Sequence, residues 1–152
     1  MGFETIHAWG LRLSCPHCVD AREMKPSTPG IGLALVAAAS VGSIPDMKVL
    51  LNAGANVNFN AGKVFGRPLH VAAFAGHDMA VRLLLEHGAN PNLQSFKGYT
   101  ALHLAAISDR ASIVQMLLDN KADPNKKDGF DETPLLYAAL AGHSGVTKVL
   151  LA

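Results

Sequence analysis

The sequence repeats itself with a period of 33 residues. His70 returns as His103, and the paired alanines and leucines that follow each histidine return at the same spacing. Corresponding residues along the chain are Ala72, Ala105 and Ala138, then Leu84 and Leu117, and then Asn92 and Asn125. A fixed period of this length is the sequence signature of a repeat protein, in which each unit stacks on the next.

Within one period the residues predict two short helices. Thr100 and Thr133 precede the first helix, where a hydroxyl can accept a free backbone N–H. Gly54 and Gly88 follow the second helix, where a left-handed residue ends the last turn without strain. Lys121 occupies that position in the third unit, and we expect it to cost on the order of 1 kcal/mol.

The composition fits thin helices that are stable only when stacked. Hydrophobic residues make up 49% of the chain and aromatic residues only 6%, so the core is built from leucine, valine and alanine. One unit cannot bury its own apolar face, and at least about three units are needed to bury a continuous core.

The units resemble ankyrin repeats over about residues 31–152. The opening, middle and closing motifs of that family match Thr133-Pro134-Leu135 and Pro68-Leu69-His70, Gly76-His77 and Gly142-His143, and Gly88-Ala89-Asn90 with Asn92. The resemblance implies an all-α solenoid of helix-turn-helix units with hairpin-like finger loops. It predicts about four units, the last of them partial.

We expect two segments along the chain. Residues 1–29 do not fit the repeat and form an N-terminal extension, which either packs on the first unit or is a disordered tail. Residues 30–152 form the repeat domain, and the apolar run of residues 30–41 is too short to span a bilayer, which needs about 20 residues. The predicted units are about 30–62, 63–95, 96–128 and 129–152.

Cys15-Pro16-His17-Cys18 is the one motif outside the repeats that suggests chemistry. Cys15 and Cys18 have the spacing of half a zinc site, but the second pair of ligands is missing. The tetrapeptide also looks like that of disulfide oxidoreductases, whose thioredoxin fold would need more chain than is available before the repeats. Two free thiols is the favoured interpretation, and we predict no metal and no cofactor.

The net charge bears on which kinds of partner the chain can bind, and the cysteine content bears on its location. With 13 basic and 12 acidic residues the net charge is +1, and no basic face of the kind that nucleic-acid phosphates require is evident. We therefore expect no nucleic acid, membrane or small-molecule substrate as a partner. Two cysteines do not make a disulfide framework, which favours an intracellular location, in the cytoplasm or the nucleus.

No catalytic constellation is present, so we predict that the chain is not an enzyme. No phosphate loop, dinucleotide fingerprint or nucleophile elbow occurs. In the resembled family, His70 and His103 are structural hydrogen-bonding groups. We expect the loop carboxylates, which include Asp128 and Asp131, to be solvated and turn-forming.

The resemblance implies a binding surface on the fingers and on the exposed side of the first helices. Phe96 and Phe130 stand in polar loops, and each either packs on a neighbouring finger or acts as an aromatic anchor, a side-chain type enriched in binding hot spots. The candidate residues are Phe65, Phe74, Phe96, Lys97, Tyr99, Ile107, Ser108, Phe130, Glu132 and Leu140.

The predicted function is a non-enzymatic module that binds another protein through this concave surface. The alternative is a substrate-targeting arm of a larger enzyme or ubiquitin-ligase subunit, whose catalytic part lies outside this chain. The apolar residues at the end of the chain, Val149 to Leu151, motivate the alternative.

Overall fold

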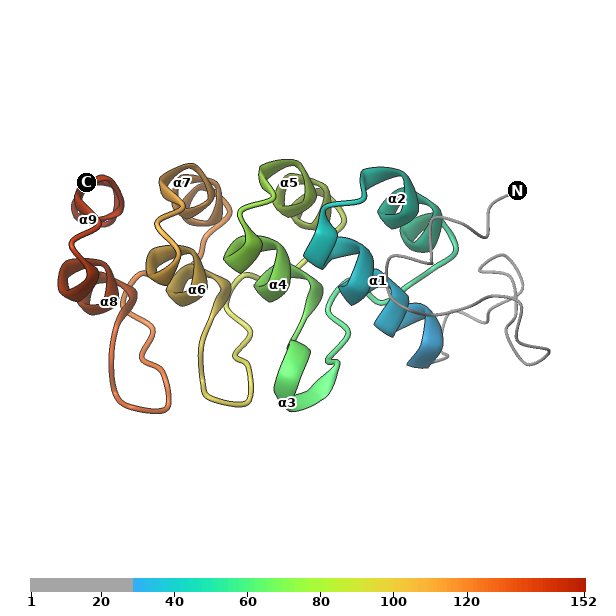
Figure 1. Ribbon diagram of the computed structural model, residues 1–152, viewed down its shortest axis with the longest axis horizontal. Helices are drawn as coiled ribbons and strands as arrows, with labels where there is room; N and C mark the ends of the chain where they lie inside the picture. The colour runs from blue at the N-terminus through green and yellow to red at the C-terminus, as the bar shows by residue number, and fades with distance from the viewer. Residues whose placement is uncertain (1–28) are drawn as a thin grey trace.

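The computed structural model describes residues 29–152, and this part of the chain is built from helices in two layers (Figure 1). The inner layer comprises α1 (Pro29–Val41), α4 (Pro68–Ala75), α6 (Ala101–Ile107) and α8 (Pro134–Ala141). The outer layer comprises α2 (Ile44–Asn52), α5 (Asp78–Glu86), α7 (Ala111–Asp119) and α9 (Ser144–Leu151). A further short helix, α3 (Gly62–Phe65), lies in a loop, and no strand occurs between residues 29 and 152. The prediction of an all-α solenoid is confirmed.

Each helix packs on its counterpart in the next unit, so each of the two layers is a continuous row of helices (Figure 1). Paired alanines allow this close approach, and Ala72, Ala73, Ala105 and Ala106 are fully buried between inner helices. Most of these helices have seven to nine residues. Isolated helices of that length are marginal in water, so their stability comes from packing between units.

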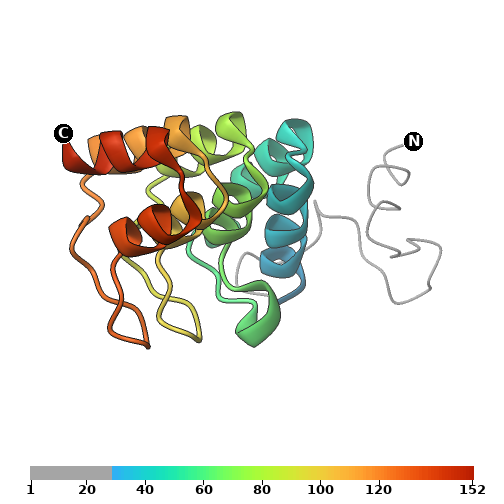
Figure 2. The ribbon, with the colours of Figure 1, turned by 60° about the vertical axis from the view of Figure 1, so that its left-hand side comes forward.

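Long loops project from the inner layer, all toward the same side of the molecule (Figure 2). Each loop leads from an outer helix to the next inner helix. We call them finger 2 (residues 58–67), finger 3 (residues 92–100) and finger 4 (residues 125–133). Finger 2 differs from the others because it contains the helical turn α3.

Histidines at the start of two inner helices hold the next finger. His70 Nε2 lies 3.0 Å from the carbonyl oxygen of Leu93 in finger 3, and His103 Nε2 lies 3.0 Å from that of Glu132 in finger 4. His103 Nδ1 accepts the backbone N–H of Thr100 at 3.1 Å. Since Nδ1 is an acceptor, the neutral ring carries its proton on Nε2 and donates it to Glu132. The structural role expected for these histidines is confirmed.

Asparagines at the base of the fingers add a second link between units. Asn58 Oδ1 accepts the backbone N–H of Asn90 at 2.9 Å, and Asn92 Oδ1 accepts that of Asp123 at 2.7 Å. Each link joins residues that are more than 30 positions apart in the chain. These bonds fix the bases of neighbouring fingers relative to each other.

The local predictions at helix ends have mixed outcomes. Thr100 caps α6, since its hydroxyl accepts the N–H of His103, and Lys121 has the expected left-handed backbone with φ 68°. The cap predicted for Thr133 is wrong, because its side chain makes no capping hydrogen bond to α8. Arg67 does not cap α4 either, and its Nη1 donates to the carbonyl of Asn58 at 2.6 Å.

Helix α1 is the longest of the described helices, and Gly32 in its first half is buried. A Cβ atom at Gly32 would lie 2.4 Å from the ring of Phe59 in finger 2, so the glycine makes room for that ring. No helix between residues 29 and 152 has both the length and the apolar character needed to cross a bilayer.

We expect the stability of the fold to fall as the pH is lowered from about 6.5 to about 4. Burial lowers the pKa of His70 from 6.5 to about 4, opposed by its hydrogen bond to Leu93 and assisted by the positive charge of Arg67. In this window the unfolded histidine binds a proton that the folded one does not, so the free energy of unfolding decreases toward acid. At about 1.4 kcal/mol per pKa unit, the loss at His70 is on the order of 3 kcal/mol.

Urea denaturation at a series of pH values between 4 and 7.5 measures this loss. The His70→Gln variant should show a smaller loss over the same window, because its amide does not titrate. His87 is an exposed histidine on the outer side, so His87→Gln provides a control for the same substitution outside the core. An unchanged slope in His70→Gln would contradict the assignment.

Candidate partner-binding surface

Fingers 3 and 4 are hairpins of the same geometry. In finger 3 the N–H of Ser95 donates to the carbonyl of Tyr99 at 2.8 Å, and in finger 4 the N–H of Asp128 donates to that of Glu132 at 2.9 Å. Both tips use a left-handed residue, which is Gly98 in finger 3 and Asp131 in finger 4. The tips are therefore well-defined turns and not open loops.

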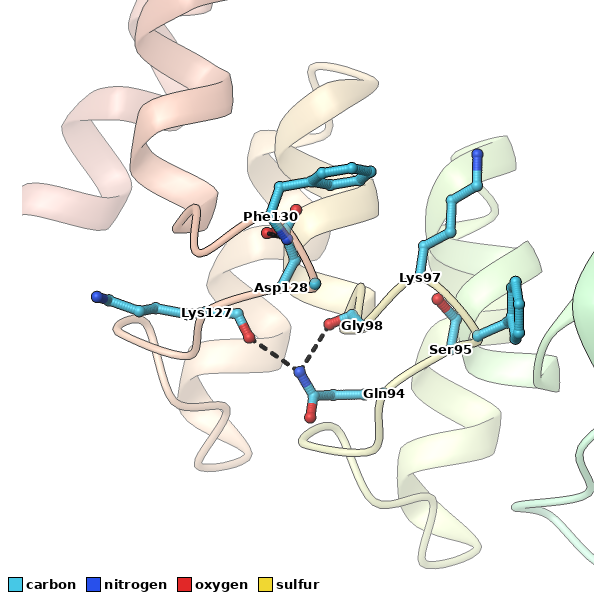
Figure 3. Close-up of a pocket in the computed structure, with 9 residues that line it drawn as sticks. Gln94, Ser95, Lys97, Gly98, Lys127, Asp128 and Phe130 are labelled. Carbon is cyan, nitrogen blue, oxygen red and sulfur yellow. Dashed lines mark hydrogen bonds between the residues drawn. The ribbon is translucent and has the colours of Figure 1, made fainter.

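Direct hydrogen bonds join the two hairpins to each other. The N–H of Gly129 donates to the carbonyl of Lys97 at 2.9 Å. The Gln94 amide donates to the carbonyls of Gly98 at 2.8 Å and Lys127 at 2.9 Å, as Figure 3 shows. The side chains at these two tips are therefore carried by hairpins that are hydrogen-bonded to each other.

Asp128 organises finger 4 from within. Its carboxylate accepts the Tyr137 hydroxyl at 2.6 Å and the backbone N–H groups of Phe130 at 2.8 Å and Glu132 at 3.0 Å. Burial alone would raise the Asp128 pKa, but these hydrogen bonds and the nearby His103 together lower it. Asp128 forms the turn, as expected, but only 8% of it is exposed, so the expectation that it is solvated is wrong. The contact that the sequence pattern does not show is the one to Tyr137 on α8, nine residues further along the chain.

Tyr99, one of the predicted binding residues, lies in a cluster of three rings. Its ring centroid is 5.9 Å from that of Tyr137 and 6.0 Å from that of His103, and the Tyr137 and His103 centroids are 6.1 Å apart. The Tyr99 residue is half-buried. A substitution of Tyr99 would therefore disturb the contact between units 3 and 4 as well as any bound partner.

Each of the three described fingers exposes one large apolar side chain at its tip. The exposed fractions are 83% for Val64, 66% for Phe96 and 63% for Phe130, and we call these three residues the fingertip row. Neither phenylalanine is buried against a neighbouring finger. Val64 is not among the predicted residues, because finger 2 is one residue longer than the others and the repeat period does not match its positions to theirs.

A second row runs along the inner helices and uses one of the last two residues of each helix. It consists of Phe74 on α4, Ile107 on α6 and Leu140 on α8, and we call it the inner-helix row. Phe74 and Leu140 are exposed, while Ile107 and its neighbour Ser108 are half-buried. The two rows lie at different heights on the same units, one at the finger tips and the other on the helices.

An open groove lies between the tips of fingers 3 and 4. Phe96 and Lys97 line it on one finger, and Lys127, Asp128 and Phe130 line it on the other. Figure 3 shows the side chains of Lys97 and Phe130 rising on the same side of the two hairpins. Glu132 is half-buried at the base of finger 4.

Some predicted residues fall outside what the structure describes. Phe65 lies in α3, but its side chain is not among the described ones. Cys15 and Cys18 precede residue 29 and lie outside the described residues, so the interpretation of this motif stays open. Between residues 29 and 152, no group of three or more histidine, cysteine, aspartate or glutamate side chains is arranged to hold a metal ion.

Comparison with known protein families identifies the repeat. The family model described as ankyrin repeats (3 copies) matches residues 33–128, which is more than half of the chain. The chain belongs to the ankyrin-repeat family. The matched region includes fingers 2 and 3 and most of the inner helices that carry the candidate surface.

Three similar proteins are much longer than this chain, and only a short segment of each aligns with it. The chain is 38% identical over 72 residues to E3 ubiquitin-protein ligase XBAT32 of Arabidopsis thaliana, covering 47% of this chain and 14% of the ligase. It is 44% identical over 55 residues to E3 ubiquitin-protein ligase HACE1 of Danio rerio, covering 36% and 6%. It is 43% identical over 56 residues to palmitoyltransferase AKR1 of Kluyveromyces lactis, covering 37% and 7%. The aligned segments are thus small parts of these relatives.

We expect Gly98→Ala to destabilise the contact between fingers 3 and 4. The φ of Gly98 is +83°, and a Cβ atom there would lie 2.4 Å from the backbone nitrogen of Gly129. The left-handed backbone alone costs an alanine about 1 kcal/mol, and the clash with finger 4 adds to that cost.

The matched control is Gly88→Ala, with φ +85° and no atom within 4 Å of the added Cβ. It should show only the cost of the left-handed backbone. Urea denaturation of both variants gives the comparison, and equal losses of stability would contradict the close contact between the fingers.

Proposed function

We propose that this chain is a non-enzymatic protein-interaction module that binds its partner through the fingertip row and the inner-helix row. The proposal is carried mainly by the exposure of Phe96 and Phe130 on fingers that are hydrogen-bonded to each other. Aromatic side chains are enriched among residues that dominate binding energy. The proposal agrees with the family, whose repeats are interaction modules without catalytic residues.

Rigid display explains how such a surface gains affinity. Ordering a flexible loop on binding costs free energy, and a loop that is already held in its bound geometry avoids most of that cost. Fingers 3 and 4 are fixed by the bonds from Gln94 and Gly129 and by the histidine contacts to the preceding units. We therefore expect little backbone change when the partner binds.

The double variant Phe96→Ala/Phe130→Ala should weaken partner binding at least about tenfold, since two exposed anchors are removed. Both side chains are exposed, so far-UV circular dichroism and the thermal midpoint should change little. Partners are first identified by affinity purification and mass spectrometry, and the affinity of each purified partner is then measured by calorimetry.

Val49→Ala/Met79→Ala provides the matched control on the outer helices α2 and α5, where both side chains are also exposed. This variant should bind as the wild type does. A partner that loses affinity equally with both double variants, or with neither, would contradict the proposed surface.

A second candidate function is supported by the relatives. We infer that the module serves as a substrate-targeting arm of a longer protein that carries a ubiquitin-ligase or other transferase activity. Two of the relatives above are named E3 ubiquitin-protein ligases and one a palmitoyltransferase, and the segments similar to this chain cover 6% to 14% of their lengths.

An antibody against residues 62–130 tests this candidate on the endogenous protein. The targeting-arm function predicts a band much larger than 152 residues would give, and ubiquitin transfer or acyl transfer by the immunopurified protein. A single endogenous band at the size of 152 residues would exclude the larger-enzyme function and leave the interaction module unaffected.

A further inference from the structure

We propose that the fingertip row, together with the neighbouring Lys63 and Lys97, binds a short acidic peptide segment whose carboxylates alternate with large apolar side chains. This inference rests on the proposed interaction function and specifies the chemistry of the partner. The apolar side chains would lie against Phe96 and Phe130, and the carboxylates would face Lys63 and Lys97.

The charges on fingers 2 and 3 have one sign only. The sequence contains no aspartate or glutamate from residue 47 to residue 77, nor from residue 87 to residue 108. These stretches include both fingers and the inner helices α4 and α6. Their charged side chains at the fingers are Lys63, Arg67 and Lys97, so an acidic ligand meets no carboxylate there.

The cations lie next to the exposed rings. The ammonium group of Lys63 on finger 2 lies 4.5 Å from the ring centroid of Phe96 on finger 3. Lys97 follows Phe96 in the chain, and Figure 3 shows its side chain rising on the same side as Phe130. A ligand that covers the rings therefore comes within reach of both lysines, which favours apolar and acidic side chains in close succession.

Finger 4 sets the limit of the basic region. Lys127 there pairs with Asp131 at 3.1 Å, and both oxygens of Asp128 accept hydrogen bonds within the unit. Finger 4 thus offers the Phe130 ring without a free excess of positive charge. We expect the carboxylates of the ligand to lie over fingers 2 and 3 and an apolar residue to lie on finger 4.

Single-stranded nucleic acid is the other class of ligand that combines negative charge with flat apolar groups. Its affinity depends on neutralising many phosphates, which requires a longer basic track than two exposed lysines. The acidic peptide is therefore the better match.

Fluorescence anisotropy with the full chain and labelled nine-residue peptides tests the proposal. The probe alternates glutamate and leucine, one control replaces each glutamate with lysine, and the other replaces each leucine with serine. We expect the glutamate–leucine probe to bind, and both controls to bind at least about tenfold more weakly. Binding of the probe should weaken as salt is added, since exposed charges are screened.

Two charge-reversal variants localise the binding. Lys63→Glu/Lys97→Glu should lower the affinity for the probe at least about tenfold and raise the affinity for the lysine–leucine peptide. Lys48→Glu/Lys148→Glu makes the same change in net charge on the outer helices, at two other exposed lysines, and should bind the probe like the wild type. Circular dichroism confirms that both variants are folded.

Any one of three results would overturn the proposal. The first is that the glutamate–leucine probe does not bind, and the second is that the lysine–leucine peptide binds as tightly as the probe. The third is that oligo(dT) binds more tightly than the probe. If one of them occurs while Phe96→Ala/Phe130→Ala still weakens binding of a purified partner as expected, the interaction function stands and only the acidic-peptide inference fails. If that double variant also leaves partner binding unchanged, the binding surface itself is wrong.

Discussion

The hydrogen bond from an inner-helix histidine to the next finger is the interaction on which the candidate surface depends. His70 holds finger 3 at Leu93, and His103 holds finger 4 at Glu132. Each bond crosses from one unit to the next, so it forms only when the helices are stacked. Stacking in turn requires the paired alanines, which leave space for neighbouring inner helices to approach. Packing of the helices and placement of the fingers are therefore coupled.

A buried polar network of Thr100, His103 and Asp128 lies where fingers 3 and 4 meet the apolar helices. The neutral His103 ring accepts from Thr100 and donates to Glu132, and burial lowers its pKa despite the opposing effects of the Glu132 hydrogen bond and the Asp128 charge. Asp128 accepts three hydrogen bonds and Tyr137 donates one of them. Such networks are costly when one member is removed, because the remaining polar groups stay buried without a partner. The network supports fingers 3 and 4 from below, while the rings of Phe96 and Phe130 at their tips are exposed.

In the fingers, the backbone sets the shape and the side chains set the chemistry of the exposed surface. Backbone hydrogen bonds within and between hairpins determine the shape of the tips, and these bonds do not depend on which side chains stand there. The tip side chains can therefore vary without loss of the scaffold, which is the physical reason that a fold of this kind serves many partners. In this chain they are a valine, two phenylalanines and lysines, and this composition is the basis of the acidic-peptide proposal.

The period, the helices and the stacking could all be predicted from the sequence, because spaced alanines, leucines and glycines report directly on local geometry and burial. It also identified Phe96, Phe130 and the loop around them as candidates, since an aromatic residue in a polar loop stands out. Tertiary structure alone decided that Tyr99 is half-buried, that Asp128 is enclosed and that Val64 is exposed. Those outcomes depend on contacts between different loops and helices, such as the Tyr99 ring against the Tyr137 ring and the Tyr137 hydroxyl bonded to Asp128, and on the extra residue in finger 2. The repeat period carries no information about such contacts, because they form between side chains that only the folded chain brings together.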